Sequence, residues 1–215
     1  MNNLLEYHKI INEPEPLRTE KHKELKIDFI MQDTKDLISE SLEGVERVKR
    51  IINDLKTFSR TDQAEFVDAD INECIESAVN ICRNELKYKI ELEKNFQELP
   101  AVTLVPQHIE QVFINILINA SQAIEQRGCI IIESRLHNNK VMITFTDNGP
   151  GIDNETMKHL FEPFYTTKDI GEGTGLGLSV SYDIVKAHGG DLKVKSKLGE
   201  GASFIIELPI FQSKI

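Results

Sequence analysis

Two asparagines one helical turn apart are the first residues whose type and spacing could do chemistry. Asn115 and Asn119 stand in the run Asn-Ile-Leu-Ile-Asn-Ala, and a four-residue spacing on a helix places both amides on the same side. An amide beside a strongly apolar stripe needs a hydrogen-bond partner or a ligand, because leaving it desolvated and unpaired is costly. Taken alone, two such asparagines more often face solvent or hydrogen-bond to the local backbone than form a binding site.

An aspartate followed by glycines makes a second candidate. Asp147-Asn148-Gly149-Pro150-Gly151 comes directly after the β-like run 141–146. An aspartate at the end of a strand can accept a hydrogen bond from an amino group, and the glycines let a flat ring approach the backbone. Adenine, with its exocyclic amine, suits that geometry. The same five residues also make an excellent simple turn, and by themselves they fit both interpretations equally.

A glycine-rich segment makes a third candidate. Glycine occupies every second position from Gly171 to Gly177, and an amphipathic pattern with Val180 and Ile184 follows directly. Glycines that open a helix expose backbone amides, and the positive end of the helix dipole favours a polyphosphate there. A flexible linker is disfavoured because the helix follows at once and has its own stop at 189–190. The spacing matches neither the Walker pattern nor a dinucleotide-binding fold.

The segment 160–168, Leu-Phe-Glu-Pro-Phe-Tyr-Thr-Thr-Lys, lies between the last two candidates. Its aromatic residues fit a core, and Lys168 fits an ordinary solvated charge. A loop of this length between a purine-type turn and a phosphate-type loop also fits a lid. In that case Lys168 could reach a phosphate.

Together and in this order, the four segments resemble the catalytic ATP-binding domain of sensor histidine kinases, which has the Bergerat-type fold. The resemblance extends from Phe66 to Pro209. It comprises an asparagine box at Asn115 and Asn119, a first glycine box at 147–151, a phenylalanine box at 161–164 and a second glycine box at 173–177.

The resemblance implies a fold, two ligands and a site. The fold is α+β, a two-layer α/β sandwich, and the ligands are ATP and Mg²⁺. Asp147 would bond the adenine amine, Asn119 would bind Mg²⁺, and Asn115 would help to hold the phosphates. Magnesium needs few protein ligands where phosphate oxygens supply the rest. The implied ATP-binding residues are Asn115, Asn119, Asp147, Gly149, Gly151, Lys168, Gly173, Thr174, Gly175, Leu176 and Gly177.

Helices and strands that could position these residues are predicted between residues 61 and 215, the expected catalytic domain. Periodicity and end signals predict helices over 71–86, with Asp70 as the cap, and from Pro106 to Gln126. Alternating apolar residues predict short strands at 90–92 and 102–104 and two hairpins. The hairpins pair 129–135 with 141–146 and 191–196 with 202–208. This order favours a sheet covered on one face by helices.

Residues 1–60 have a different pattern. The run Glu-Pro-Glu-Pro at 13–16 must end any helix, and from Leu25 to Phe58 apolar residues recur at three- and four-residue steps. About forty residues of helix, roughly 60 Å, would leave an exposed apolar stripe. The segment 39–60 resembles the second helix of the dimerisation and histidine-phosphotransfer hairpin of the same family. We therefore expect a partial antiparallel helical hairpin that forms a homodimer as a four-helix bundle.

The phosphoacceptor histidine of that family is not recognisable in this sequence. In the family it stands in a His-Glu-x-x-x-Pro-like box on the first helix. His8 is followed by Lys9 instead of an acidic residue and then by the break at Pro14, and His22 has no matching context. We therefore expect that the substrate histidine is absent and that Met1 opens a shortened chain or one part of a split protein.

Composition narrows the class of protein. A net charge of −10 argues against binding nucleic acid or an anionic membrane surface. Cys74, Cys82 and Cys129 form neither a zinc motif nor a disulfide framework. The apolar run 112–118 is shorter than the roughly 20 residues that cross a bilayer, so a cytoplasmic location is expected for this chain, although a longer parent protein could carry a membrane anchor.

The sequence thus predicts an ATP-dependent protein-histidine kinase module with a response regulator receiver domain as its partner. The same fold also serves serine kinases that bind sigma factors and the ATPase clamps of topoisomerases, mismatch-repair proteins and chaperones. Neither class explains the long N-terminal helix or the phenylalanine box at 161–164.

Overall fold

The computed structural model describes residues 23, 26–59, 65–168 and 173–211. The chain divides into two compact units, one up to Lys49 and the other from Arg50. A long helix, α3, accounts for most of what is described before residue 60, and a sheet with shorter helices follows. The expected domain boundary between residues 60 and 61 stays a prediction.

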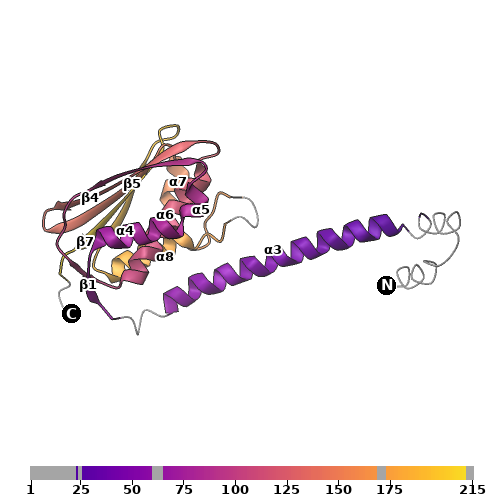
Figure 1. Ribbon diagram of the computed structural model, residues 1–215, viewed down its shortest axis with the longest axis horizontal. Helices are drawn as coiled ribbons and strands as arrows, with labels where there is room; N and C mark the ends of the chain where they lie inside the picture. The colour runs from indigo at the N-terminus through magenta and orange to yellow at the C-terminus, as the bar shows by residue number, and fades with distance from the viewer. Residues whose placement is uncertain (1–22, 24–25, 60–64, 169–172, 212–215) are drawn as a thin grey trace. The chain divides into compact units, whose positions relative to one another are not determined.

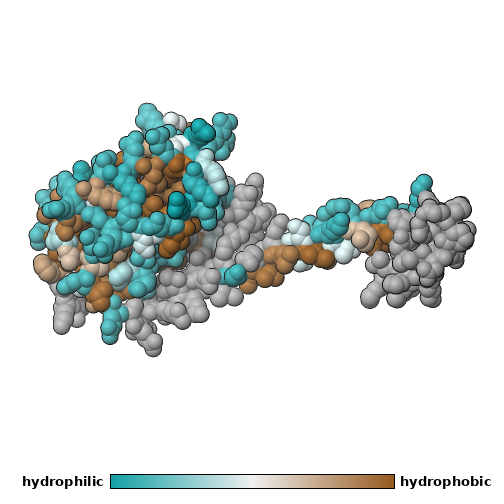
Figure 2. All heavy atoms as spheres, in the orientation of Figure 1, coloured by the Kyte–Doolittle hydropathy of each residue, from teal (hydrophilic) through white to brown (hydrophobic). Residues whose placement is uncertain are grey.

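Helix α3 runs from Ile27 to Ser59. Its 33 residues correspond to about 50 Å, somewhat less than the apolar periodicity predicted. Several large apolar side chains on the helix are at least half exposed, although Ile27 is buried, and Figure 2 shows brown residues gathered along one side of it. These side chains belong to Phe29, Met31, Leu37, Ile38, Leu42, Val45 and Val48. The part of the expected hairpin that precedes α3, with His8 and His22, falls on residues outside the described ranges, so the hairpin and the four-helix bundle stay predictions.

The sheet of the second unit has five strands in the order β2-β4-β5-β7-β6. Strand β2 runs parallel to β4, and the other neighbours are antiparallel. A separate antiparallel pair joins β1 to β3. The strands are β1 (Val67–Ala69), β2 (Ile90–Phe96), β3 (Val102–Leu104), β4 (Gly128–His137), β5 (Lys140–Asp147), β6 (Asp191–Ser196) and β7 (Ala202–Pro209).

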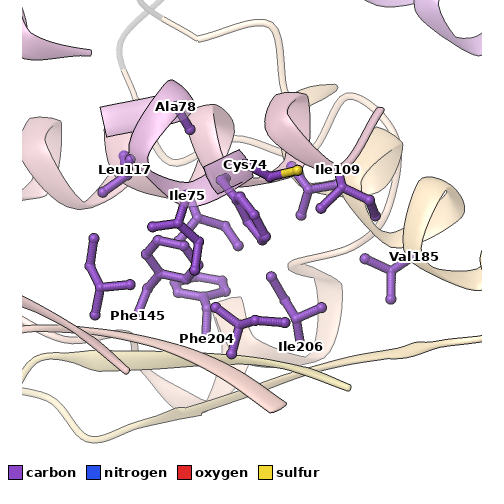
Figure 3. Close-up of a cluster of buried hydrophobic side chains, with 14 of the residues drawn as sticks. Cys74, Ile75, Ala78, Ile109, Leu117, Phe145, Val185, Phe204 and Ile206 are labelled. Carbon is purple, nitrogen blue, oxygen red and sulfur yellow. The ribbon is translucent and has the colours of Figure 1, made fainter. Parts of the chain in front are cut away.

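Helices α4 (Ile71–Ile81), α6 (Pro106–Ala123) and α8 (Gly177–Ala187) cover one face of this sheet (Figure 1). The core lies between the two layers, where Ile75 and Leu117 from the helices meet Phe145 and Phe204 from the strands (Figure 3). Every second residue of β5 and β7 is buried, as expected for strands with one covered face. The predicted α+β two-layer sandwich is confirmed.

Most predicted elements are present, with some differences at their ends. The helix predicted over 71–86 is two helices, α4 and α5 (Arg83–Leu86), separated at Cys82. Helix α6 ends at Ala123 instead of Gln126, because Ile124 is extended and buried and its carbonyl accepts a hydrogen bond from Lys89 Nζ at 3.1 Å.

Two elements were not predicted. Strand β1 is only three residues long, and α7 (Asn154–His159) is a helix of six. The signal for α7 was present, since Asp153 caps it by accepting hydrogen bonds from the amides of Glu155 and Thr156 at 2.8 and 2.9 Å.

Candidate functional site

A pocket of about 630 Å³ lies among α6, the end of β5, the segment 165–168 and the start of α8. The four segments singled out in the sequence therefore meet at one place. Most of the predicted site residues line the pocket, namely Asn115, Asn119, Asp147, Gly151, Lys168, Gly173, Thr174, Gly175 and Gly177. Gly149 and Leu176 do not line it, and both support residues that do.

Asp147 is the last residue of β5, and its side chain is only 6% exposed. Its Oδ1 accepts hydrogen bonds from the amides of Gly149 at 2.9 Å and Ala202 at 3.3 Å. Burial raises the pKa of this carboxyl group, and the two amides oppose that shift. Its Oδ2 has no hydrogen-bond partner among the described residues, so it is available to accept a bond from a ligand amine.

The phenylalanine segment is tied to the glycine-rich segment by a backbone hydrogen bond. The amide of Phe164 donates to the carbonyl of Gly175 at 2.9 Å. Gly175 has a φ of 66°, and a Cβ there would lie 2.4 Å from the carbonyl carbon of Phe164. Only glycine allows this approach. Phe161 stacks on Tyr182 with ring centroids 5.2 Å apart, whereas Phe164 is 69% exposed, so only one of the two phenylalanines packs against the core.

The start of α8 is held from both sides. Leu176 is buried, and its amide donates to Thr174 Oγ1 at 3.3 Å. Asn115 Nδ2 donates to the carbonyl of Gly177 at 3.0 Å and to Ser181 Oγ at 3.1 Å. The amide of Asn115 therefore joins α6 to the start of α8 through two acceptors. The predicted contact between Asn115 and phosphate stays a prediction.

Asn119 Oδ1 accepts a hydrogen bond from Lys168 Nζ at 3.2 Å, and the same ammonium donates to Gln122 Oε1. The ammonium is therefore hydrogen-bonded to the same side-chain oxygen that, by the family resemblance, is expected to bind Mg²⁺. An amide oxygen that faces a pocket and already attracts a cation fits a magnesium ligand. Gln122 was not singled out in the sequence, although its position three residues after Asn119 places it on the same helix face.

The described residues contain no group of three or more His, Cys, Asp or Glu side chains that could hold a metal ion. A magnesium ion at Asn119 would therefore need most of its ligands from phosphate oxygens and water.

His188, which follows α8, joins that helix to the residue before α6. It is 2% exposed, its Nε2 accepts a hydrogen bond from the amide of Val105 at 3.1 Å, and its Nδ1 lies 2.7 Å from the carbonyl of Ile184. This pattern requires a neutral ring with its proton on Nδ1. Burial lowers the pKa of His188, which favours the neutral form.

Residues 104–212 match a family described as histidine kinase-, DNA gyrase B-, and HSP90-like ATPases. The chain belongs to this family. It is 34% identical over 195 residues to the signal transduction histidine-protein kinase AtoS of Escherichia coli strain K12, which covers 86% of this chain and 31% of AtoS. The chain thus spans less than a third of the length of this curated relative.

Solved structures agree with this assignment. The catalytic domain of histidine kinase ThkA is 32% identical, with a TM-score of 0.62 over 68% of this chain and 96% of that domain. A structure of ThkA in complex with the response regulator protein TrrA is 26% identical, with a TM-score of 0.63 over 97% of this chain and 55% of the ThkA chain.

These similarities confirm the prediction of an ATP-binding domain of the sensor histidine kinase type. They do not favour the serine kinase regulators or the ATPase clamps. Among the residues that the structure describes, no helix is both long and apolar enough to cross a membrane.

Proposed function

We propose that this chain is the ATP-dependent kinase module of a two-component signalling system and phosphorylates a histidine. The observation that carries the proposal is the pocket itself, which unites a buried carboxylate at Asp147, an amide oxygen at Asn119 and the N-terminus of α8. The first is suited to an adenine amine, the second to Mg²⁺ and the third to phosphates. Family membership supports the same assignment.

Phosphoryl transfer needs positioning and charge stabilisation more than covalent help from the protein. A nitrogen of the acceptor imidazole forms a bond to the γ-phosphorus as the bond to the β,γ-bridging oxygen breaks, and ADP leaves. Backbone amides at the start of α8 stabilise the negative charge on the phosphates. Mg²⁺, held by Asn119 when bound, supplies further charge neutralisation at the phosphates.

The acceptor histidine lies outside the given sequence in this proposal. Neither His8 nor His22 stands in the sequence context expected of a phosphoacceptor. The phosphoryl group then passes to the receiver domain of a response regulator. The solved complex of ThkA with TrrA supports a partner of this kind.

A homodimer through the N-terminal helices completes the proposal. Leu42 and Val45 on α3 are 62% and 63% exposed, and a continuous apolar stripe of this kind is costly to leave in water. A second copy of the helix would cover it in a helical bundle. Equilibrium sedimentation should find a dimer, and Leu42→Glu together with Val45→Glu should shift it to a monomer.

The kinase proposal is tested with a separate polypeptide that carries an intact first helix with its histidine box. This polypeptide, the chain and radiolabelled Mg·ATP are mixed, and acid-labile, base-stable phosphate is expected on the polypeptide. Asp147→Ala in this chain should abolish the labelling. Label that persists with Asp147→Ala, or no label with the unsubstituted chain, would contradict the proposal.

Intact-mass analysis of this chain alone after incubation with Mg·ATP tests whether the chain contains an acceptor histidine. No gain of mass is expected. A stable, acid-labile gain of one phosphate would show that the chain carries its own acceptor.

A further inference from the structure

Gln122 and Lys168 form a contact in the pocket that the proposed function does not use. Lys168 Nζ donates to Gln122 Oε1 and to Asn119 Oδ1, the second bond measuring 3.2 Å. The two acceptors lie three residues apart on α6, and the lysine comes 49 residues after Asn119 and 46 residues after Gln122. Both amide oxygens are neutral acceptors, and the ammonium is a full positive charge.

The stem of Lys168 is also guided toward these acceptors. Its amide donates to Thr166 Oγ1 at 3.2 Å. Gly173 packs against the stem, and a Cβ at that position would lie 3.3 Å from Lys168 Cδ and 2.7 Å from Thr166 Oγ1. A side chain at residue 173 would therefore push on both Thr166 and the stem of Lys168. The Lys168 side chain is therefore contacted along its stem by Gly173 and at its ammonium by Asn119 and Gln122.

We propose that Gln122 is a positioning residue of the nucleotide site, which together with Asn119 holds the Lys168 ammonium on the oxygen that binds magnesium. The ammonium competes with the ion for Asn119 Oδ1. Mg·ATP must displace it before the ion can be bound. This inference rests on the proposed function of the same site.

Charge and distance explain why the two cations exclude each other. Mg²⁺ binds oxygen at about 2.1 Å and accepts little distortion of its octahedral geometry. An ammonium 3.2 Å from the same oxygen would place three positive charges within a few ångströms, and their repulsion is strong near a protein surface. Once the ammonium leaves Asn119, it can bind the phosphates that arrive with the ion, where it gains a charge-assisted hydrogen bond.

Gln122 acts on this equilibrium through Lys168 alone. Its side chain is exposed, so its replacement should leave the fold intact. Losing its hydrogen bond weakens the hold on the ammonium and favours the displaced state. Removing Gln122 should therefore tighten the binding of Mg·ATP, which is the opposite of what is expected from removing a residue that contacts the nucleotide.

The test is a double-mutant cycle with Gln122→Met and Lys168→Met, read by calorimetric titration with Mg·ATP. Gln122→Met should lower the dissociation constant by about twofold to tenfold, as expected from the loss of one hydrogen bond. In the Lys168→Met background, Gln122→Met should change nothing, because no ammonium remains to be held. A merely structural role for Gln122 would give the same effect in both backgrounds.

Two controls test whether the change in Mg·ATP affinity arises at the end of the pocket that binds the metal and the phosphates. Adenosine carries no phosphate, so its dissociation constant should not change in Gln122→Met. Gln126→Met, an exposed glutamine that does not line the pocket, should bind Mg·ATP as the unsubstituted chain does.

The outcomes separate this inference from the proposed function. If the unsubstituted chain fails to bind Mg·ATP, the proposed function fails. If that chain binds Mg·ATP while Gln122→Met binds it with equal or lower affinity, or binds it more tightly in both lysine backgrounds, then only the competition between Lys168 and magnesium is refuted.

Discussion

Two glycines in the turn between β6 and β7 allow the contact between this turn and Asp147 to be tested separately from backbone strain. Gly199 and Gly201 both have a φ of 82°, so alanine should be strained equally at the two positions. Their surroundings differ. A Cβ at Gly199 would meet nothing within 4 Å, whereas a Cβ at Gly201 would lie 2.0 Å from the backbone carbonyl oxygen of Asp147. Gly201→Ala therefore tests this contact, and Gly199→Ala is its matched control.

The expected magnitudes follow from the two geometries. Alanine in the left-handed region costs about 1–2 kcal/mol at either position. At Gly201, contacts of a Cβ below 3.0 Å essentially never occur, so Asp147 or the turn must move by about 1 Å. The bond of 3.3 Å between the Ala202 amide and Asp147 Oδ1 would then exceed hydrogen-bonding distance. Losing a bond to a charged acceptor adds about 1.5–3 kcal/mol.

Urea unfolding and titration with adenosine measure the two effects. Gly199→Ala should lose about 1–2 kcal/mol of unfolding free energy and bind adenosine normally. Gly201→Ala should lose about 2.5–5 kcal/mol and bind adenosine at least tenfold more weakly, because the acceptor for the adenine amine has moved. Equal adenosine affinity in the two variants would refute the argument that β7 positions Asp147.

Three further predictions concern other residues of the site and its support. Asp147→Ala should weaken ATP and adenosine binding alike by at least about tenfold, measured by calorimetry, because both ligands carry the adenine amine. Asn115→Ala should lower the unfolding free energy by about 1–3 kcal/mol in urea, because the carbonyl of Gly177 and the hydroxyl of Ser181 lose a shared donor; a smaller change would mean that α6 and α8 do not depend on this amide. The contribution of His188 to the unfolding free energy should be constant above about pH 6.5 and should fall below that pH. Burial lowers the pKa of this histidine, so the unfolded chain takes up the proton first as the pH falls. Urea unfolding at several pH values should show a weaker dependence of the unfolding free energy on pH in His188→Gln. The dependence should not vanish, since burial lowers the pKa of His108 as well.

Local signals in the sequence predicted local structure well. The hairpin between β4 and β5 turns at Asn138 and Asn139, which both have positive φ values, and asparagine tolerates that conformation better than most residues. Asp70 caps α4 by accepting from the amide of Asn72 at 2.7 Å. In each case the residues that decide the structure are neighbours in the sequence, so their types alone carried the information.

Contacts between distant segments could not be predicted in the same way. The partners of Asn115 on α8 lie 62 and 66 residues away, and nothing in the asparagine run indicates that its amide is used to join two helices. The contact between Gln122 and Lys168 depends equally on how α6 and the segment 165–168 pack. The motifs therefore predicted which residues surround the pocket, and only the packing decides which of them are already hydrogen-bonded to the protein.

The two ends of the pocket have separate supports, and this separation has a consequence for function. Asp147 is held by β7, through the amide of Ala202 and the close approach of Gly201. The start of α8 is held by α6 through Asn115. Because no hydrogen bond joins the two supports among the described residues, damage to one should not reach the other. Gly201→Ala should weaken adenosine and ATP by the same factor, whereas Asn115→Ala should weaken ATP and leave adenosine unchanged. Equal losses for both ligands in both variants would show instead that α6, α8 and the sheet respond as one body.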